Sequence, residues 1–351
     1  MGIVRVITSK ELARLAGVSQ STVSRALNDS PLISIEKKVE IQQLAKKLRF
    51  EMNSQAKSLR TRRTDTIGIM FPHFFMNLST NLYFTHLFDS LQGELSKYDY
   101  DLLIIYDSKD QSQLSPLEKM IKRKKVDGFV LVRPNLSKEE KEMLDNSNLP
   151  YVSVFCQDYE DEGVSKYSIN TYDGGVLAGT YFAQYKEFSP LYFGLHDDDV
   201  DSSNRFSGFT DGLSVDGRNA SSVEKLASDM SIPGAYQAVI KHLSYFKTKR
   251  SVFVFNDMMA CGLLLALKDQ QIRVPEQVQL ISNDDIPLAQ WMTPQLSTLH
   301  FPNEKLIETA CKRLVREIVT GRLENENVQL SPELKLRGTT NTTFGYAGGS
   351  I

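Results

Sequence analysis

The sequence predicts an α/β protein with an N-terminal helix-turn-helix head and a two-lobed body of parallel sheets flanked by helices. Two observations lead to this prediction. Residues 8–28 contain the start, turn and stop signals of two successive short helices, and from Asp65 onward short β-rich runs alternate with amphipathic stretches. With 351 residues, of which 41% are hydrophobic, the chain is long enough for a small head and a body of two lobes.

The first helix of the head is expected to begin after Thr8. Thr8 and Glu11 have the spacing of a capping box, in which the hydroxyl accepts from a backbone amide and the carboxylate reaches back. Gly17 ends this helix at a position where a positive φ suits glycine alone. The apolar stripe of this helix is expected to comprise Leu12, Leu15 and Ala16.

Two further helices complete the head. Ser19 is the expected N-cap of the second helix, with Thr22 at its third position, and Ser34 caps the third helix. In the second helix the inward positions are Val23, Ala26 and Leu27. In the third helix the positions that pack back on this pair are Val39, Ile41, Leu44, Ala45 and Leu48.

The outer face of the second helix carries side chains that can read base edges in a DNA major groove. Arg25 can donate two parallel hydrogen bonds to guanine and Gln20 can pair with adenine, each discriminating by about 1–3 kcal/mol. Ser21 and Thr8 suit phosphate or water-mediated contacts. The alternative is a set of solvated residues on a small helical bundle. We predict that the head binds DNA through Thr8, Ser19, Gln20, Ser21, Thr22, Arg25 and Asn28.

Charge is distributed unevenly along the chain. Residues 1–65 hold 13 Lys and Arg against 6 Asp and Glu, whereas the remaining residues hold 28 against 37. A basic head on an acidic body concentrates the attraction to phosphate at one end of the protein. The pI of about 6.3 for the whole chain hides this asymmetry.

The segment Asn53–Arg63, Asn-Ser-Gln-Ala-Lys-Ser-Leu-Arg-Thr-Arg-Arg, is basic and follows the head. Head and segment together resemble the lactose/galactose-repressor (LacI/GalR) family of bacterial transcriptional regulators, and the resemblance runs from about Ile7 to Thr340. It implies a hinge helix at about residues 53–61 that forms on DNA. The family usually has a proline before Asn53, where this chain has Met52.

The resemblance also implies roles for four residues of this hinge. Leu59 takes the place of a leucine that wedges into the minor groove, and Ala56 lies at the close approach to the partner's hinge helix. Lys57 and Arg60 flank the DNA backbone. An apolar wedge between base steps kinks DNA by roughly 20–90°. A flexible basic linker is the alternative interpretation.

The body contains eight short β-rich runs that are expected to form buried strands, separated by amphipathic helical stretches. So many units are too many for one open sheet with a single core, and two lobes with a cleft at the carboxyl ends of their strands fit better. The runs are Ile67–Phe71, Asp101–Tyr106, Gly128–Val132, Tyr151–Phe155, Ser168–Asn170, Leu191–Leu195, Ser251–Asn256 and Val278–Asp284.

The resemblance implies a periplasmic-binding-protein-like body whose lobes are joined by three crossovers. These are expected near Ser168–Thr171, near Ser297–Phe301 and around Gln329–Pro332. The first lobe then comprises about residues 66–168 and 301–330, and the second about residues 169–298 and 331–340. Residues 341–351 are expected to form a tail.

Four polar residues follow predicted strands and match the family's effector-contacting motifs position by position. They are Asp173, Arg205, Asn256 and Asp284. Carboxylates, an amide and a guanidinium are the fixed acceptors and donors that a polyhydroxylated sugar needs. Each has a structural alternative. Asp173 and Asn256 could cap helices at Gly174 and near Met258, and Arg205 could pair with an inter-lobe carboxylate. Beside Asp284, Asp285 is expected to cap the helix that has Pro287 in its first turn.

Aromatic residues are further candidates for the effector site. Trp291 could line the mouth of the cleft, and Phe301 stands where sugar-responsive relatives commonly have a polar residue. The stretch Pro72–Tyr83 is rich in aromatic side chains that could stack on a sugar ring, although core packing explains them equally well.

No metal, cofactor or catalytic residue is expected. The run from His196 to Asp201 holds a single histidine without a second at metal-ligand spacing. The cysteines Cys156, Cys261 and Cys311 are scattered in apolar surroundings, as packing residues are.

Together these features predict a DNA-binding transcriptional regulator, a repressor of a carbohydrate-utilisation operon that a small-molecule effector, a sugar, controls. One short helix reads few bases, so a homodimer, or a tetramer, on a palindromic operator is expected. The first thirty residues lack the apolar stretch of a signal peptide, and no apolar run approaches membrane-spanning length, so a cytoplasmic location is expected. The alternatives are a sugar receptor without DNA function, an enzyme such as a glycosidase, and a regulator that uses a phosphoprotein co-effector.

Overall fold

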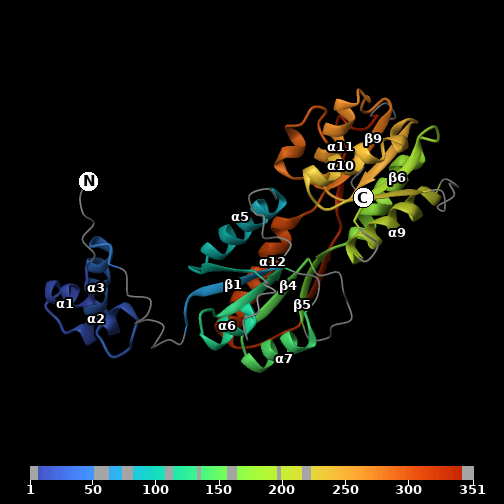
Figure 1. Cartoon of the computed structure of the whole chain (residues 1–351). Helices are drawn as coiled ribbons and strands as arrows, with labels where there is room; N and C mark the ends of the chain where they lie inside the picture. Colours follow the sequence, from blue (N-terminus) through green and yellow to red (C-terminus); the bar gives the residue numbers. More distant parts are fainter. Residues whose placement is uncertain are drawn as a thin grey trace. The chain divides into compact units, whose positions relative to one another are not determined.

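The computed structural model describes residues 7–50, 63–72, 82–106, 114–132, 136–155, 164–195, 199–215 and 223–341. The chain divides into two compact units, Met1–Asp65, which is the head, and Thr66–Ile351, which is the body (Figure 1). Within the described ranges, every helix is too short or too polar to cross a membrane.

The head consists of three helices, α1 (Ser9–Leu15), α2 (Gln20–Leu27) and α3 (Ile35–Lys47). Their N-caps are Thr8, Ser19 and Ser34, and each cap hydroxyl accepts from the amide three residues later, at 3.1–3.4 Å. Gly17, between α1 and α2, has a φ of 65°, as the turn was expected to require. The three caps and the glycine turn predicted from the sequence are confirmed.

The core of the head differs from the prediction at two positions. Leu15 is 47% exposed and Val39 is 42% exposed, so neither belongs to the buried stripe. Leu15 lies two residues after the buried Ala13 in α1, and Val39 lies two residues before the buried Ile41 in α3. Two residues correspond to roughly 200° around a helix, so each of these side chains lies on the opposite side of its helix from that buried residue. The buried set is small and comprises Leu12, Ala13, Ala16, Val23, Ala26, Ile41 and Ala45.

The first lobe of the body is built on a six-stranded sheet in which all neighbouring strands are parallel. Every residue of its central strand β3 is buried, as expected for a parallel strand covered on both faces. Figure 1 shows α5 (Leu82–Ser96) and α12 (Asn303–Thr320) on one face of this sheet, and α6 (Pro116–Lys122) and α7 (Lys138–Ser147) on the other. The strand order is β11 (Asn327–Leu330), β5 (Ser165–Ile169), β4 (Tyr151–Val154), β3 (Gly128–Val132), β1 (Thr66–Phe71), β2 (Asp101–Tyr106).

The second lobe repeats this plan with a second six-stranded sheet, in which only the pairing of β12 with β10 is antiparallel. Its helices are α8 (Thr171–Ala183), α9 (Val200–Ser214), α10 (Ile232–Lys241) and α11 (Asp257–Asp269), with short 3-10 helices η4 (Leu243–Phe246) and η5 (Pro287–Gln290). The strand order is β12 (Glu333–Lys335), β10 (Thr298–His300), β9 (Val278–Asp284), β8 (Arg250–Val254), β6 (Ser189–Gly194), β7 (Glu224–Ala227).

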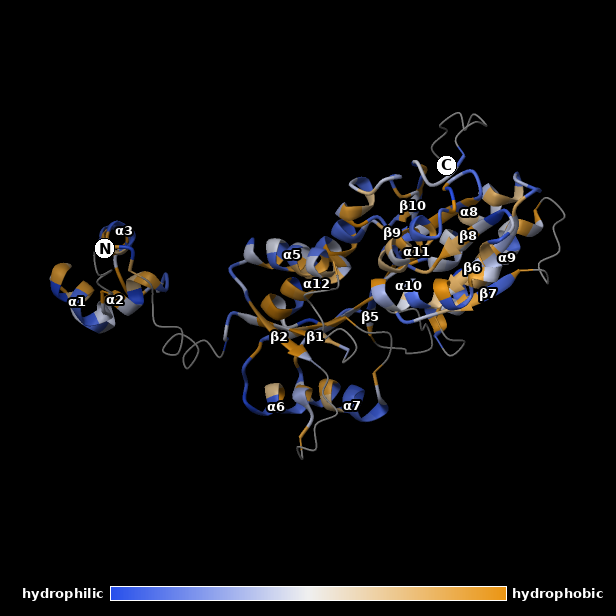
Figure 2. Cartoon of the chain, turned by 45° about the horizontal axis from the view of Figure 1, so that its top comes forward, coloured by the Kyte–Doolittle hydropathy of each residue, from blue (hydrophilic) through white to orange (hydrophobic). Residues whose placement is uncertain are grey.

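The chain passes between the two sheets three times. It leaves β5 for α8 after Ile169, returns from β10 to α12 after His300, and passes from β11 to β12 after Leu330. Strands β1 and β2 are mostly hydrophobic and the outer helix α7 is mostly hydrophilic (Figure 2). The predicted fold class, a helix-turn-helix head with a two-lobed α/β body of parallel sheets flanked by helices, is confirmed.

Glycines allow two helices of the second lobe to touch through their backbones. A Cβ added to Gly208 of α9 would lie 2.0 Å from the carbonyl oxygen of Tyr172 in α8, and one added to Gly175 of α8 would lie 2.3 Å from the carbonyl oxygen of Arg205. Only glycine permits this approach. The contact sets the position of α9, and therefore that of the Arg205 side chain.

Candidate functional site

The outer face of α2 presents the side chains that were expected to read DNA. Gln20, Ser21 and Arg25 are exposed. Within the part of the chain that the structure describes, the Arg25 guanidinium has no hydrogen-bonding or ionic partner, so its donors face solvent. An uncommitted arginine on a short, capped helix is suited to bidentate contact with a base edge.

The other predicted DNA-contacting residues of the head also serve its fold. The hydroxyls of Thr8 and Ser19 accept from the amides of Glu11 and Thr22 as N-caps. The Ser19 hydroxyl lies 2.7 Å from that of Ser21 and 2.9 Å from that of Thr22.

At the ends of α2, two amide side chains hold neighbouring residues. Gln20 Nε2 donates to Ser9 Oγ at 3.3 Å, and Asn28, the C-cap residue, donates from its side chain to the carbonyl of Ser24. The predicted hinge residues Ala56, Lys57, Leu59 and Arg60 lie outside the described residues.

In the body, Arg205 of α9 is a buried cation, only 5% exposed. Its Nη1 donates to the carbonyl of Phe255, and its guanidinium carbon lies 4.2 Å from the centre of the Phe255 ring and 5.5 Å from that of Phe301. Among the described residues, its Nε has no partner. The two rings hold the guanidinium plane in place, and Phe301, which is 4% exposed, therefore lies against Arg205.

The side chains of two aspartates interact electrostatically with the Arg205 guanidinium. Burial, followed by the charge of Asp257, holds the pKa of Asp284 well above its ordinary value, and Arg205 opposes this. Burial also raises the pKa of Asp201 at the start of α9, with the same opposition from Arg205. The Thr171 hydroxyl donates to Asp201 at 3.3 Å. Asp284 ends β9 with a φ of 110°, a conformation that turns its backbone out of the strand.

Asp257, the first residue of α11, lies fully buried behind Asp284. Its carboxylate accepts from the hydroxyls of Ser282 and Thr298, the latter at 2.7 Å, and from the amide of Ile286 at 2.9 Å. Burial raises the pKa of Asp257 to about 7 in spite of these three donors.

The first lobe contributes Tyr83 from α5 and Asn303 from the start of α12. Burial, followed by the charge of Asp284, raises the pKa of the Tyr83 hydroxyl, while Arg205 and the Asn303 amide oppose this. Asn303 is 3% exposed, and its Oδ1 has no partner among the described residues. Groups from both lobes therefore meet at one place. We call the set Tyr83, Asp201, Arg205, Asp284 and Asn303 the inter-lobe cluster.

The remaining predicted effector residues have other surroundings. Asn256 is the N-cap of α11 and accepts from the amide of Met259 at 2.8 Å. Asp173 does not cap a helix at Gly174, because α8 begins at Thr171 with Asn170 as its N-cap. The Asp173 carboxylate instead accepts from the hydroxyl of Ser331 at 3.0 Å. Trp291, just after η5, is 82% exposed.

Sequence reasoning did not assign a role in the site to Asp201, Asp257 or Asn303. Asp257 directly follows the predicted Asn256, and this proximity was the available signal for it, whereas Asp201 ends an acidic run to which the sequence analysis gave no role. No group of three or more His, Cys, Asp or Glu side chains in the described ranges could hold a metal ion.

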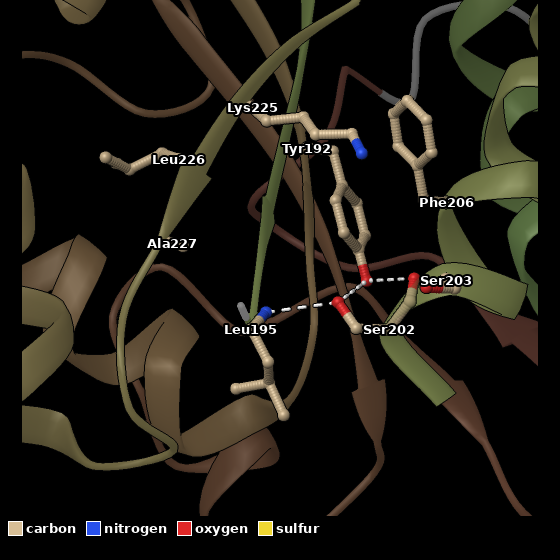
Figure 3. Close-up of a pocket in the computed structure, with 8 residues that line it drawn as sticks. All are labelled: Tyr192, Leu195, Ser202, Ser203, Phe206, Lys225, Leu226 and Ala227. Carbon is tan, nitrogen blue, oxygen red and sulfur yellow. Dashed lines mark hydrogen bonds between the residues drawn. The ribbon is translucent and has the colours of Figure 1, made fainter. Parts of the chain in front are cut away.

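A pocket of about 240 Å³ lies between β6, β7 and the start of α9 (Figure 3). Among its lining residues the Tyr192 hydroxyl and the Ser202 hydroxyl lie 3.1 Å apart, and the amide of Leu195 donates to Ser202 Oγ at 3.1 Å. The ammonium of Lys225 lies 3.9 Å from the centre of the Phe206 ring. These polar atoms of Tyr192, Leu195 and Ser202 thus bond to one another.

Segments of both the head and the body match models of known protein families. Residues 8–53 match the model of bacterial regulatory proteins of the lacI family, and residues 187–340 match that of a periplasmic binding protein-like domain. The chain is 28% identical to the ribose operon repressor of Escherichia coli K12 and 29% identical to the transcriptional repressor PurR of Vibrio parahaemolyticus. Each alignment covers 95% of this chain, and they cover 99% and 98% of the two relatives.

The fold is similar to that of the lac repressor dimer solved with operator and the anti-inducer ONPF. That similarity has a TM-score of 0.76 at 18% identity, over 96% of this chain and 99% of the other.

Proposed function

The chain belongs to the LacI family of bacterial regulatory proteins, and we propose that it is a transcriptional repressor whose binding to operator DNA is set by a sugar held at the inter-lobe cluster. The observation that carries this proposal is the pairing of two sites in one chain. One is the exposed face of α2 with its uncommitted Arg25, and the other is a polar cluster to which both lobes contribute and in which Arg205 and Asn303 are buried.

On the DNA side, Arg25 and Gln20 read base edges, and Ser21 makes phosphate or water-mediated contacts. Thr8, which caps α1, contacts phosphates, and so do Ser19, Thr22 and Asn28 at the ends of α2, because contacts that position a reading helix fall largely on the DNA backbone. The hinge residues Ala56, Lys57, Leu59 and Arg60 add minor-groove and backbone contacts. Two such heads in a homodimer match a palindromic operator, and the protein works in the cytoplasm, where that DNA lies.

On the effector side, Arg205 and Asp284 bind the ligand from the second lobe, while Tyr83 and Asn303 bind it from the first. A ligand that contacts both lobes favours one arrangement of them over another, and coupling of this kind typically amounts to about 1–3 kcal/mol. Phe301 supports the site by holding Arg205, and Asn256 by starting α11. Asp173, which bonds to Ser331, and the exposed Trp291 lie in other surroundings, and their contact with the effector stays a prediction. The name of the ribose operon repressor supports a carbohydrate-utilisation operon as the target.

DNA binding is tested by comparing the intact chain with residues 66–351 in gel-shift titrations against genomic fragments at several salt concentrations. The intact protein should prefer specific fragments and lose affinity as salt rises, since each phosphate contact releases counterions. Residues 66–351, with circular dichroism showing that they are folded, should bind no fragment. Equal binding by the two forms would exclude the head as the DNA site.

Effector binding is tested by a thermal-shift screen of mono- and disaccharides. A sugar that raises the melting temperature of the native chain should have no effect on Asp284→Asn or Arg205→Ala. Asp211→Asn is the matched control, because this exposed carboxylate lies on α9 but accepts from the Tyr172 hydroxyl at 2.6 Å, away from the cluster. A sugar that raises the melting temperature of both variants as much as that of the native chain would show that the effector site lies elsewhere.

A further inference from the structure

The body carries the longest uninterrupted run of basic residues in the sequence, at residues 122–125. All four of these side chains are exposed. The body as a whole is acidic, with 37 Asp and Glu against 28 Lys and Arg in residues 66–351, so the run is a local exception. We call the four residues, Lys122, Arg123, Lys124 and Lys125, the basic turn.

The basic turn lies at the end of the body where the chain from the head enters. It connects α6 to β3, and the amide of Asp127, two residues after Lys125, donates to the carbonyl of Thr66 at 2.8 Å. Thr66 is the first residue of β1 and of the body. The turn is therefore fixed next to the point where the chain arrives from the predicted hinge.

The backbone of the basic turn is held in place, whereas three of its side chains are available to an anion. The amides of Arg123, Lys124 and Lys125 each donate to a carbonyl of α6, at 3.0–3.3 Å. Lys122 pairs with Glu118, one turn earlier on α6, at 2.6 Å. In the part of the chain that the structure describes, the side chains of Arg123, Lys124 and Lys125 have no hydrogen-bonding or ionic partner.

Exposed carboxylates near Thr66 lie on the other side of β1. Strand β1 lies between β3 and β2, and β2 begins at Asp101, which is exposed and aligned with Thr66. Asp99, just before β2, is also exposed. On the β3 side, Asp127 is only 8% exposed. A duplex that passes the β3 side of Thr66 therefore meets positive charge, and one that passes the β2 side meets negative charge.

The short connection between the predicted hinge and the body limits how far the basic turn can be from DNA. Thr66 follows Arg60, at the end of the predicted hinge, by six residues, which span at most about 20 Å. One turn of duplex is about 34 Å long. With the hinge on an operator, the basic turn therefore stays within roughly one helical turn of the hinge contact, and duplex DNA presents a phosphate charge about every 1.7 Å along its axis.

We propose that the basic turn is a second DNA contact, in which Arg123, Lys124 and Lys125 bind phosphates of the duplex that flanks the operator. The contact is independent of sequence, because lysine and arginine neutralise phosphates by charge. It adds affinity without changing the choice of operator. This inference rests on the proposed function, since it requires the head and the hinge to be on operator DNA.

The test measures the salt dependence of binding by the full chain to labelled duplexes, using fluorescence anisotropy. One duplex is the shortest form of the preferred genomic fragment that keeps its advantage over random DNA, and the other extends it by about 15 base pairs on each side, roughly one and a half helical turns. The native chain should bind the longer duplex more tightly and with a steeper dependence on salt. Replacing Arg123→Gln, Lys124→Gln and Lys125→Gln together should remove this difference and lower the salt slope on the longer duplex by about one to three, since each phosphate contact contributes about one.

The matched control replaces Lys241→Gln, Lys247→Gln and Arg273→Gln together. It removes the same charges from exposed positions of the second lobe, where they precede β8 and β9, and it should bind both duplexes as the native chain does.

Two outcomes would overturn this inference and leave the proposed function standing. One is an equal salt slope on the longer duplex for the native chain and the basic-turn variant, with circular dichroism showing that both are folded. The other is an equal fall in the control, because the effect would then come from net charge alone. If the native chain prefers no genomic fragment, the proposed function is wrong and this inference is wrong with it.

Discussion

At the residue scale, Arg25 is the side chain that we expect to recognise the DNA sequence, whereas the other basic residues of the head attach it to any duplex. We expect Arg25→Ala to abolish the preference for the operator over random duplex, because a bidentate contact with a base discriminates by about 1–3 kcal/mol. Weak, salt-sensitive attachment should remain, since the other basic residues of the head are unchanged. Gel-shift competition between operator and random duplex measures both effects.

Arg14→Ala is the matched control for this variant, since Arg14 is an exposed arginine of the same head, on α1. It should lower the affinity for all duplexes alike. If Arg25→Ala behaves in the same way, Arg25 contacts phosphate and does not read a base.

Because Asp257 is buried, the stability of the body is expected to depend on pH. Because its pKa rises from an ordinary value near 3.8 to about 7 on folding, the folded state binds a proton between these two pH values that the unfolded state has released. This contribution to stability is present at low pH and is lost as pH rises through 7. Asp257→Asn, neutral at every pH, should remove the decline, which amounts to a few kcal/mol because one pKa unit corresponds to about 1.4 kcal/mol.

Urea unfolding of both proteins at pH 5, 6, 7 and 8 measures this difference. Asp269→Asn is the control, because Asp269 lies on the same helix but accepts from the Tyr236 hydroxyl at the surface. Its profile should follow the native one. Parallel profiles for the native chain and Asp257→Asn would show that Asp257 keeps its charge in the folded state.

At the scale of elements, the contact between α8 and α9 depends on glycine. Gly208→Ala places a Cβ against the Tyr172 carbonyl, at 2.0 Å in the undisturbed backbone, so the two helices must separate. We expect a loss of about 1–3 kcal/mol in the free energy of unfolding, the usual result of overpacking. Affinity for the effector should fall as well, because Arg205 lies one turn before Gly208 on α9.

Gly93→Ala on α5 is the matched control for this prediction. A Cβ at Gly93 meets nothing within 4 Å, so the change should stabilise the chain by about 0.5–1 kcal/mol through helix propensity. Urea unfolding and effector titration measure both variants. A Gly208→Ala chain as stable as the native one would mean that the helices adjust without loss.

The elements themselves were largely predictable from the sequence, because their signals are local. The caps Thr8, Ser19 and Ser34 are where the sequence puts them, and all eight predicted strands overlap observed ones. The sequence did not predict β7 (Glu224–Ala227), since this edge strand buries only Leu226 and has no apolar run. Leu15 and Val39 were misplaced because an apolar residue can lie on either flank of a short helix, and tertiary contacts decide between them.

The candidate site was predictable only in part, because its residues come together through contacts distant in sequence. Arg205 and Asp284 were singled out by position after a strand and by family resemblance. The contributions of Asp201 and Asn303 depend on how the starts of α9 and α12, which belong to different lobes, come together in the folded chain, and neighbouring residues in the sequence do not reveal this. Whether Arg205 and Asp284 bind an effector stays a prediction.

At the scale of the whole molecule, the three crossovers explain how a small ligand could act on distant DNA. Tyr83 and Asn303 belong to the first lobe and Asp201, Arg205 and Asp284 to the second, so a molecule bound at the inter-lobe cluster contacts both lobes. A ligand shifts a conformational equilibrium only by its difference in affinity for the two states. Contacts to both lobes provide such a difference.

In the proposed function the predicted hinge converts a change in the body into a change on DNA, and Leu59 is the residue that tests this. A leucine inserted between base steps partly unstacks them and bends the duplex, so Leu59→Ala should weaken the operator complex and reduce its bend from the roughly 20–90° of a wedged site. Circular-permutation gel shifts measure the bend directly. Lys57→Ala is the control. Removing one phosphate contact should lower affinity for every sequence and reduce the salt slope by about one, with the bend intact. An unchanged bend in Leu59→Ala would show that the hinge contacts DNA without wedging into it, and the coupling between lobes and operator would then have to act through the spacing of the heads alone.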